Sequence, residues 1–266
     1  MNKQNRSELF ISHGGGPLPL LGDAGHMEMV QNLKLIASKI SKPSAILVIS
    51  AHWEAQIPTI TAGSHPALIY DYYGFPEESY EIQYPCPGEP DLAKQVQQVL
   101  GDKGINAKLD AQRGFDHGLF VPLKIMYPQA DIPCIQLSLM KNLNPREHIQ
   151  LGAALANLDY DNLLILGSGF SFHNLRAFFT PVTQDSQSMN AAFEQWLIDT
   201  CTNPELTETE RVQRLENWEA APFARYCHPR EEHLLPLHVC YGAAQSACRE
   251  YFTMTILNKQ ASVYLW

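Results

Sequence analysis

Short apolar runs alternate with amphipathic segments along the chain. An apolar run at residues 9–12 is followed by residues 26–40, in which apolar side chains recur at the three- and four-residue spacing of a helix. The continuous apolar run at residues 45–50 is typical of a strand that is covered on both faces. The pattern continues with predicted strands at 132–137, 162–166, 251–256 and 262–266 and predicted helices at 146–158, at 187–200 and again after Pro229. Strands that alternate with helices predict an α/β fold with a mostly parallel central sheet flanked by helices.

The length and composition predict a single domain. α/β domains often reach the length of this chain, 266 residues, and the sequence shows neither an internal repeat nor a linker. Hydrophobic residues make up 45% of the sequence and charged residues 18%, which supplies a sizeable core. We therefore expect residues 1–266 to form one domain.

Charge and hydropathy argue against nucleic-acid and membrane partners. The formal net charge is −9 and the Lys and Arg residues are scattered, whereas binding to a phosphate backbone needs clustered positive charge. No apolar run approaches the roughly 18 residues of a membrane span. The polar start at residues 1–8 and the early His13 leave no room for the apolar core of a signal peptide. Six cysteines without a C-x-x-C pair predict reduced thiols in a cytoplasmic protein.

Three of the ten histidines follow predicted strands. His13 comes directly after the first strand, His52 comes after the second, and His173 follows the strand at 162–166 and its glycine turn. Ligands of open α/β sheets gather at the carboxyl ends of the strands, where loops from several strands converge. Neutral imidazole is the most common side-chain ligand for metals. One such histidine alone is usually a hydrogen-bonded structural residue, but the three together indicate a metal site at this edge of the sheet.

A second group of histidines lies at residues 228–238. If Pro229 takes the first position of a helix, His228 caps that helix and His233 points inward one turn later. His228, His233 and His238 are spaced by five residues, which places them about 140° apart in turn on an ideal helix. They should therefore not all bind one metal, and we expect one ligand from this segment. The H-E-x-x-H motif of zinc proteases is absent from it.

The segment GFDHGLFVPL at residues 114–123 presents His117 between an aspartate and a glycine. A neighbouring carboxylate can hold the ring in one tautomer, so that the histidine can shuttle a proton. The alternative interpretation is a turn that caps the next helix, and the spacing supports both equally.

Other residues near these histidines are candidates for contact with a ligand. Residues 70–84 form a long aromatic loop, a kind of segment that is often functional, and its Tyr72 and Tyr73 could stack on a ring. Arg113, Arg225 and Arg230 lie close to the motif histidines and could pair with a carboxylate. The alternative is that these residues are core aromatics and surface charges.

Five motifs together resemble those of one enzyme family. ISHGGGP (11–17), SAHWE (50–54), GFDHGLFVPL (114–123), GSGFSFHNL (167–175) and HPREEHLLPLH (228–238) occur in order over nearly the whole chain. With them the sequence resembles class III extradiol ring-cleavage dioxygenases, most closely the DOPA 4,5-dioxygenase type. The resemblance implies one catalytic α/β domain over residues 1–266. It also implies that a catechol ring is opened next to its two hydroxyl groups, with both atoms of dioxygen incorporated.

The resemblance further implies roles for the histidines. A catechol must lose a phenolic proton, and the pKa of a free phenol is near 10, so a base is required near pH 7. His173 is the candidate base and His117 the candidate donor of a proton or hydrogen bond. A structural or positioning role is the alternative for His117 and His228. The implied set is His13, His52 and His233 as metal ligands, His173 as the acid/base beside the metal, and His117 and His228 in the substrate pocket.

The sequence leaves alternatives open for the third metal ligand and for the identity of the metal. In the protocatechuate relatives a glutamate stands where this chain has His233, and Glu231 and Glu232 lie beside it here. Two histidines and one carboxylate are typical of non-haem Fe(II) oxygenases, whereas three or four histidines also suit zinc. Because zinc has no redox chemistry, we expect one divalent metal, Fe(II) for activity, with Zn(II) as an alternative bound ion. His173 would be a fourth ligand only in a closed zinc site.

Two further functions would use the same residues. A zinc hydrolase would lower the pKa of a bound water towards 7, with His173 as base. A non-catalytic binding protein of the same fold would lack ligand positions, and this sequence retains them all. The dioxygenase interpretation requires a small catechol and O2 as partners, and catechol-dependent oxygen uptake separates it from the other two. The sequence leaves the particular catechol and the oligomeric state open.

Overall fold

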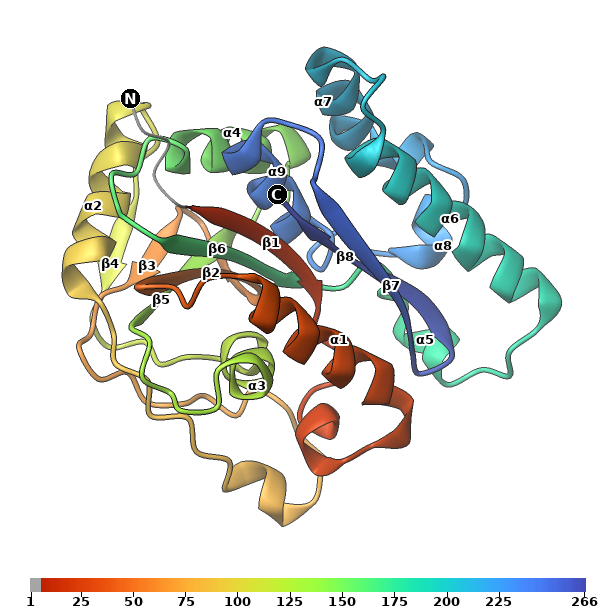
Figure 1. Cartoon of the computed structure of the whole chain (residues 1–266), viewed down its shortest axis with the longest axis horizontal. Coiled ribbons are helices and arrows are strands. Elements are labelled where there is room, and N and C mark those ends of the chain that lie inside the picture. Colours follow the sequence, from red (N-terminus) through yellow and green to blue (C-terminus); the bar gives the residue numbers. More distant parts are fainter. Residues whose placement is uncertain (1–5) are drawn as a thin grey trace.

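Parallel strands form the centre of the sheet, as the alternating pattern predicts. The computed structural model describes residues 6–266, and residues 1–5 of the polar N-terminal stretch lie outside that part. The strands are β1 (Ser7–Ser12), β2 (Ala45–Ala55), β3 (Thr59–Thr61), β4 (Lys108–Asp110), β5 (Cys134–Met140), β6 (Leu163–Gly169), β7 (Glu250–Ile256) and β8 (Lys259–Leu265). They form one eight-stranded sheet in the order β4-β3-β5-β2-β6-β1-β8-β7 (Figure 1). Strands β5, β2, β6 and β1 are parallel, and the hairpin β7-β8 adds an antiparallel edge next to β1.

Helices cover both faces of this sheet (Figure 1). The α-helices are α1 (Met27–Lys39), α2 (Pro90–Asp102), α3 (His117–Met126), α4 (Pro145–Leu155), α5 (Leu175–Phe178), α6 (Gln184–Thr202), α7 (Glu208–Glu216), α8 (Ala224–Cys227) and α9 (Leu235–Ala244). Short 3-10 helices lie at Leu18–Leu21, Ala24–His26, Glu77–Tyr80 and Trp218–Ala220. Helices α1 and α3 pack on one face, while α4 and α9 pack on the other. The fold is therefore a single α/β domain with a mostly parallel sheet between two helical layers, which confirms the predicted class.

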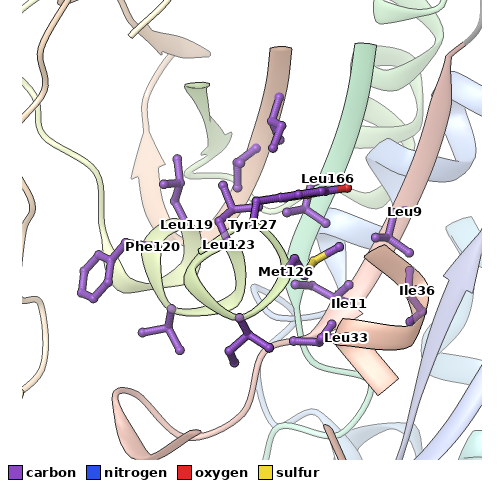
Figure 2. Packing of buried hydrophobic residues seen from close by; sticks show 14 of the residues in the cluster. Leu9, Ile11, Leu33, Ile36, Leu119, Phe120, Leu123, Met126, Tyr127 and Leu166 are labelled. Atoms are coloured by element: carbon purple, nitrogen blue, oxygen red, sulfur yellow. The ribbon is translucent and has the colours of Figure 1, made fainter. Parts of the chain in front are cut away.

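Alternation along the central strands explains the two layers of core. Successive side chains of a strand point to opposite faces, so a strand that is apolar throughout can support both layers. In β2, Ile46 and Val48 pack beneath α1 and α3, whereas Leu47 and Ile49 pack beneath α4 and α9. Figure 2 shows part of the first layer, in which α3 lies beside α1, β1 and β6. The labelled side chains of this layer are Leu9, Ile11, Leu33, Ile36, Leu119, Phe120, Leu123, Met126, Tyr127 and Leu166.

Three predicted boundaries differ from the structure for identifiable reasons. Strand β2 continues to Ala55, so His52 lies within the strand instead of beyond its end. Strand β6 continues through residues 167–169, which the glycines had predicted as a turn. The helix predicted after Pro229 begins at Leu235, because residues 229–234 form bends and turns. The prediction that Pro229 takes the first helical position is therefore wrong, and α8 ends before it.

Two further findings concern the predictions on membrane spans and on the cysteines. No helix within residues 6–266 is long and apolar enough to cross a membrane. The six cysteines, all of them in this part of the chain, are buried and form no disulfide.

Candidate metal centre and active site

The carboxyl ends of β1, β2 and β6 lie side by side because these strands pair in parallel. Ser12 of β1 is level with Gly169 of β6, and Ser50 of β2 is level with Ser168 of β6. The segments that leave these positions therefore enter one region at the edge of the sheet. His13 is the first residue after β1, and its backbone N–H donates to the Gly169 carbonyl at 2.9 Å. Parallel pairing thus brings the first predicted ligand to the predicted edge.

An irregularity in β2 brings His52 to the same region. The pairing register with β5 shifts between Ser50 and Glu54, so residues 51–53 are not held in the regular ladder. Irregularities of this kind re-aim side chains and are common next to functional sites. The backbone N–H of His52 donates to Ser50 Oγ at 3.2 Å, which fixes the position of the displaced segment.

His13 and His52 face each other, with their Nε2 atoms 3.0 Å apart. The hydroxyl of Ser168 donates to the Gly118 carbonyl and therefore accepts from Nδ1 of His13, at 3.0 Å. We assign the proton of His13 to Nδ1 on this basis, which leaves a lone pair on Nε2. A lone pair this close to a second ring nitrogen requires a proton or a metal cation between the two atoms.

A glycine in β6 allows His233 to join this pair. The backbone N–H of Phe170 donates to the His233 carbonyl at 2.9 Å, and a Cβ atom on Gly169 would lie 2.1 Å from that oxygen. Glycine is required where a second backbone approaches a strand so closely. The ring centroid of His233 lies 5.3 Å from that of His13 and 4.9 Å from that of His52. One ring nitrogen from each of the three histidines lies within 4.8 Å of the other two.

The substitution Gly169→Ala is expected to lower the free energy of unfolding by about 1–3 kcal/mol, because its methyl group overlaps a backbone oxygen that has little room to move. Chemical denaturation measures this change. Gly101→Ala is the matched control, since no atom lies within 4 Å of the added Cβ at that position in α2. Alanine in a helix is favoured over glycine by up to about 1 kcal/mol. Equal stabilities of the two variants would contradict the close approach of His233 to β6.

The three converging rings have the chemistry of a metal site. Burial, followed by the charges of neighbouring histidines, lowers the pKa of His13 and of His52 well below 6.5. The same two causes lower the pKa of His233 to about 3. All three rings are therefore neutral near pH 7, the form that binds metals. The donor set thus fits one divalent cation held by three ring nitrogens.

His173 stacks on His233 and shares a carboxylate with it. The two ring centroids are 3.4 Å apart, with an angle of 19° between the planes. Oε1 of Glu232 accepts from Nδ1 of both histidines, at 3.1 Å from His173 and 2.9 Å from His233. Burial alone would raise the pKa of Glu232, but the hydrogen bonds from these two rings outweigh it and lower the pKa below its usual range. An ionised Glu232 thus orients both rings and leaves each Nε2 with a lone pair.

A carboxylate also orients His117, but not the one that flanks it in the sequence. Oδ1 of Asp71 accepts from the backbone N–H and from Nδ1 of His117, each at 2.9 Å. Asp116 is instead fully buried and accepts from Ser50 Oγ at 2.8 Å. His117 begins α3, as the interpretation of a turn before the next helix predicts, and its ring is held by Asp71 instead of its sequence neighbour, whereas the role of proton shuttle stays a prediction. The ring lies 3.9 Å from that of His52, centroid to centroid.

Two histidines of the 228–238 segment lie apart from these rings. His228 is fully buried against the rings of Phe193 and Trp218, and its Nε2 donates to the Ser171 carbonyl at 2.7 Å. A ring without exposed surface has no contact with a cavity, so substrate contact by His228 stays a prediction that requires the ring to be uncovered. His238 is also fully buried, within α9. Of this segment, His233 alone belongs to the group formed with His13 and His52 among residues 6–266.

The three arginines considered as carboxylate partners already have partners within the protein. Arg113 binds Asp116 at 3.2 Å and lies over the ring of Trp53. Arg225 binds Glu219 and Glu231, and Arg230 binds Glu54 and Glu232. Internal ion pairs thus account for all three charges.

The aromatic loop at residues 70–84 contributes to the site in a way that the sequence did not indicate. Tyr72 is buried and its ring centroid lies 5.6 Å from that of His117, so it packs behind the site, whereas Tyr73 is exposed to solvent. The loop also supplies Asp71, which no motif marked. A carboxylate next to two tyrosines in a predicted loop was the available signal.

Comparison with known proteins defines the class that this fold and site represent. Residues 19–263 match the family described as the catalytic LigB subunit of aromatic ring-opening dioxygenase. The chain belongs to this family, and it is an extradiol ring-cleavage dioxygenase.

Individual relatives agree with this assignment over most of the chain. Dioxygenase tasH of Hapsidospora irregularis is 38% identical over 97% of this chain and 84% of its own length. A 4,5-DOPA dioxygenase extradiol of Beta vulgaris is 39% identical over 90% of this chain and 87% of its own. Among solved structures, that of an uncharacterized protein from Escherichia coli K12 superposes with a TM-score of 0.77, at 26% identity, and covers 99% of both chains.

Proposed function

We propose that the chain, as one catalytic domain over residues 1–266, opens the ring of a small catechol with O2 by means of one Fe(II) held by His13, His52 and His233. The observation that carries this proposal is the 3.0 Å approach of two neutral Nε2 atoms beside a third ring. When bound, Fe(II) supplies the one-electron chemistry that allows triplet dioxygen to react with the ring. Zn(II) fits the same three nitrogens but lacks that chemistry.

His233 is a better third ligand than the glutamates beside it. Glu231 is bound by Arg225 at 2.7 Å. Oε1 of Glu232 receives hydrogen bonds from His173 and His233. A carboxylate that accepts from the second ring nitrogen is the typical partner of a metal-binding histidine and lies behind the ligands instead of on the metal. We therefore assign Glu232 the role of fixing the tautomer of His233.

His173 is assigned as the base that removes a proton from a catechol hydroxyl. Its Nδ1 is held by Glu232 at 3.1 Å, so Nε2 is the acceptor. The ring is partly exposed and lines a cavity, which gives substrate access to it. Because Glu232 stays ionised, it also stabilises the imidazolium that forms when His173 takes the proton. A positioned base of this kind removes the need for a free phenolate near pH 7.

His117, whose ring lies beside that of His52, is assigned as a hydrogen-bond or proton donor when its ring carries a second proton. Asp71 holds its Nδ1, so that its Nε2 is the atom available to substrate or dioxygen. The ring of Tyr72 packs edge-on against it and limits its rotation. Two histidines held by two separate carboxylates thus each present Nε2 to the reaction, as an acceptor while the ring is neutral and as a donor once the ring is an imidazolium.

The buried thiols bear on where this reaction takes place. Cysteines that are free and buried in the described part of the chain fit a reducing compartment, and we propose the cytoplasm. Such a compartment also helps to keep iron in the divalent state that the proposed chemistry requires.

The experiment that tests this function compares two metals in one protein. The chain is stripped of metal with a chelator and reloaded anaerobically with Fe(II) or with Zn(II), and oxygen uptake is recorded with a catechol. We expect uptake with Fe(II) and catechol, and none with Zn(II) or with resorcinol, whose hydroxyl groups are not adjacent. Ester or amide hydrolysis by the Zn(II) form, without oxygen uptake by the Fe(II) form, would favour a zinc hydrolase.

A further inference from the structure

Two of the three assigned metal ligands have a hydrogen-bond acceptor for the second nitrogen of the ring. Nδ1 of His13 donates to Ser168 Oγ at 3.0 Å, and Nδ1 of His233 donates to Glu232 at 2.9 Å. A neutral histidine that binds a metal through Nε2 carries its proton on Nδ1, and a hydrogen bond from Nδ1 fixes that tautomer. His52 differs from the other two, because its Nδ1 forms no direct hydrogen bond with any residue that the structure describes. The third ligand therefore still requires an acceptor.

Asp71 presents a carboxylate oxygen to this nitrogen. Its Oδ2 lies 3.9 Å from Nδ1 of His52, while its Oδ1 accepts from the backbone N–H and from Nδ1 of His117, each at 2.9 Å. No other carboxylate in the described part of the chain pairs with His52. Because a direct N–H···O bond is about 2.9 Å long, Oδ2 reaches Nδ1 by an approach of about 1 Å or through one bridging water. Both side chains are partly exposed, so water has access to the gap.

Glu232 shows how one carboxylate serves a metal ligand and an acid/base group together. Its Oε1 accepts from Nδ1 of His233 and from Nδ1 of His173, whose ring centroids are 3.4 Å apart. The pair of rings beside Asp71 likewise consists of one assigned ligand and one assigned proton donor, with centroids 3.9 Å apart. Two carboxylates from distant segments of the chain therefore face two equivalent pairs of rings.

We propose that Asp71 is a positioning residue for the metal centre, which accepts the Nδ1 proton of His52 and so keeps Nε2 of that ring free for the cation. This inference rests on the ligand set of the proposed function. A carboxylate has an oxygen for each of two rings, so Asp71 orients His52 and His117 at the same time. Loss of this acceptor is expected to weaken metal binding, although Asp71 itself does not bind the metal.

Asp71→Asn tests this role because it keeps the shape of the side chain and replaces one oxygen by a donor. The amide oxygen can still accept from His117, whereas the amide N–H faces the Nδ1–H of His52, and two donors repel each other. We expect the dissociation constant for Zn(II) to rise about 10–100-fold, the usual cost of losing such a partner. The constant is measured by competition with a chromophoric chelator, without catechol or oxygen. Asp131→Asn is the matched control and is expected to leave it unchanged, because Asp131 is an exposed aspartate that binds Lys42.

A double-variant comparison separates an effect through His52 from an effect through His117. His117 is not an assigned ligand, so His117→Ala alone is expected to retain the affinity for Zn(II). In that background Asp71→Asn is expected to raise the dissociation constant by the same factor as in the wild type. An unchanged constant in either background would overturn the proposal. A lower melting temperature of the metal-free Asp71→Asn protein that accounts for the loss of affinity would make the role structural and would overturn it as well.

The side chains of His52, Asp71 and His117 are also close enough to one another to hold a cation themselves. At saturating Zn(II) we expect one ion per chain in the wild type and in Asp71→Asn. Two ions in the wild type and one in the variant would overturn the positioning role in favour of a second cation site. Because Zn(II) binding is measured without turnover, this proposal and the dioxygenase function fail separately. The expected changes in affinity, without any opening of catechol by the Fe(II) form, would contradict the function alone.

Discussion

His173→Ala is expected to retain the metal and to lose about 10²–10⁴-fold in kcat, the usual contribution of a positioned acid/base group. The structure gives the reason: the ring stacks on His233 and is oriented by Glu232, but among residues 6–266 it does not belong to the group formed by His13, His52 and His233. Elemental analysis of the purified Fe(II)-loaded variant and its rate of catechol-dependent oxygen uptake measure the two quantities separately.

A control and two alternative outcomes make this result informative. His65→Ala removes a solvent-exposed histidine and is expected to leave both quantities unchanged. Loss of metal in His173→Ala would make His173 a fourth ligand, as in a closed tetrahedral zinc site. A variant that keeps its metal and opens catechol at the wild-type rate would exclude both roles.

Replacement of any one of His13, His52 and His233 by alanine is expected to abolish stable metal binding and, with it, all turnover. Each residue contributes one of three nitrogens that lie within 4.8 Å of one another, and loss of one leaves only two donors. Metal content after gel filtration is the measurement. Full occupancy in any one variant would remove that residue from the ligand set.

Variants of the neighbouring carboxylates show whether the third metal ligand is His233 or a glutamate beside it. Glu232→Gln is expected to retain metal with an affinity about 10–100-fold lower, because it weakens the orientation of His233 without removing a ligand. Glu231→Gln is expected to retain metal fully, since Glu231 faces Arg225. A protein that keeps its metal in His233→Ala and loses it in Glu232→Gln would show that the carboxylate is the ligand.

The positions of the central elements could be predicted because they depend on local patterns. The apolar run at residues 45–50 gives the start of β2 but not its end at Ala55, and the helical spacing at residues 26–40 gives both bounds of α1 to within one residue. Parallel pairing then brings residues after different strands to one edge, so that the convergence of His13 and His52 follows from the topology.

Other features depend on contacts between distant segments, which local patterns do not contain. Gly169 was predicted as part of a turn, but it pairs with Ser12 in the sheet, and its missing side chain leaves space for the His233 carbonyl. Pro229 was predicted to begin a helix, whereas residues 229–234 lie as turns that carry His233 to β6. Asp71 was missed because its partner, His117, lies 46 positions further along the chain, and only its place beside two tyrosines in a predicted loop could have marked it.

Isotopic labelling of the product tests the central claim most directly. Fe(II)-loaded protein is supplied with dihydrocaffeate and heavy-isotope dioxygen in ordinary water, and the products are analysed by mass spectrometry after a single turnover. We expect a ring-opened product whose mass equals that of the catechol plus one dioxygen molecule, with label at both positions before the aldehyde oxygen exchanges with water. A quinone or a hydrolysis product without label, formed by the metal-loaded protein, would contradict the assignment of the His13, His52 and His233 cluster to extradiol ring cleavage.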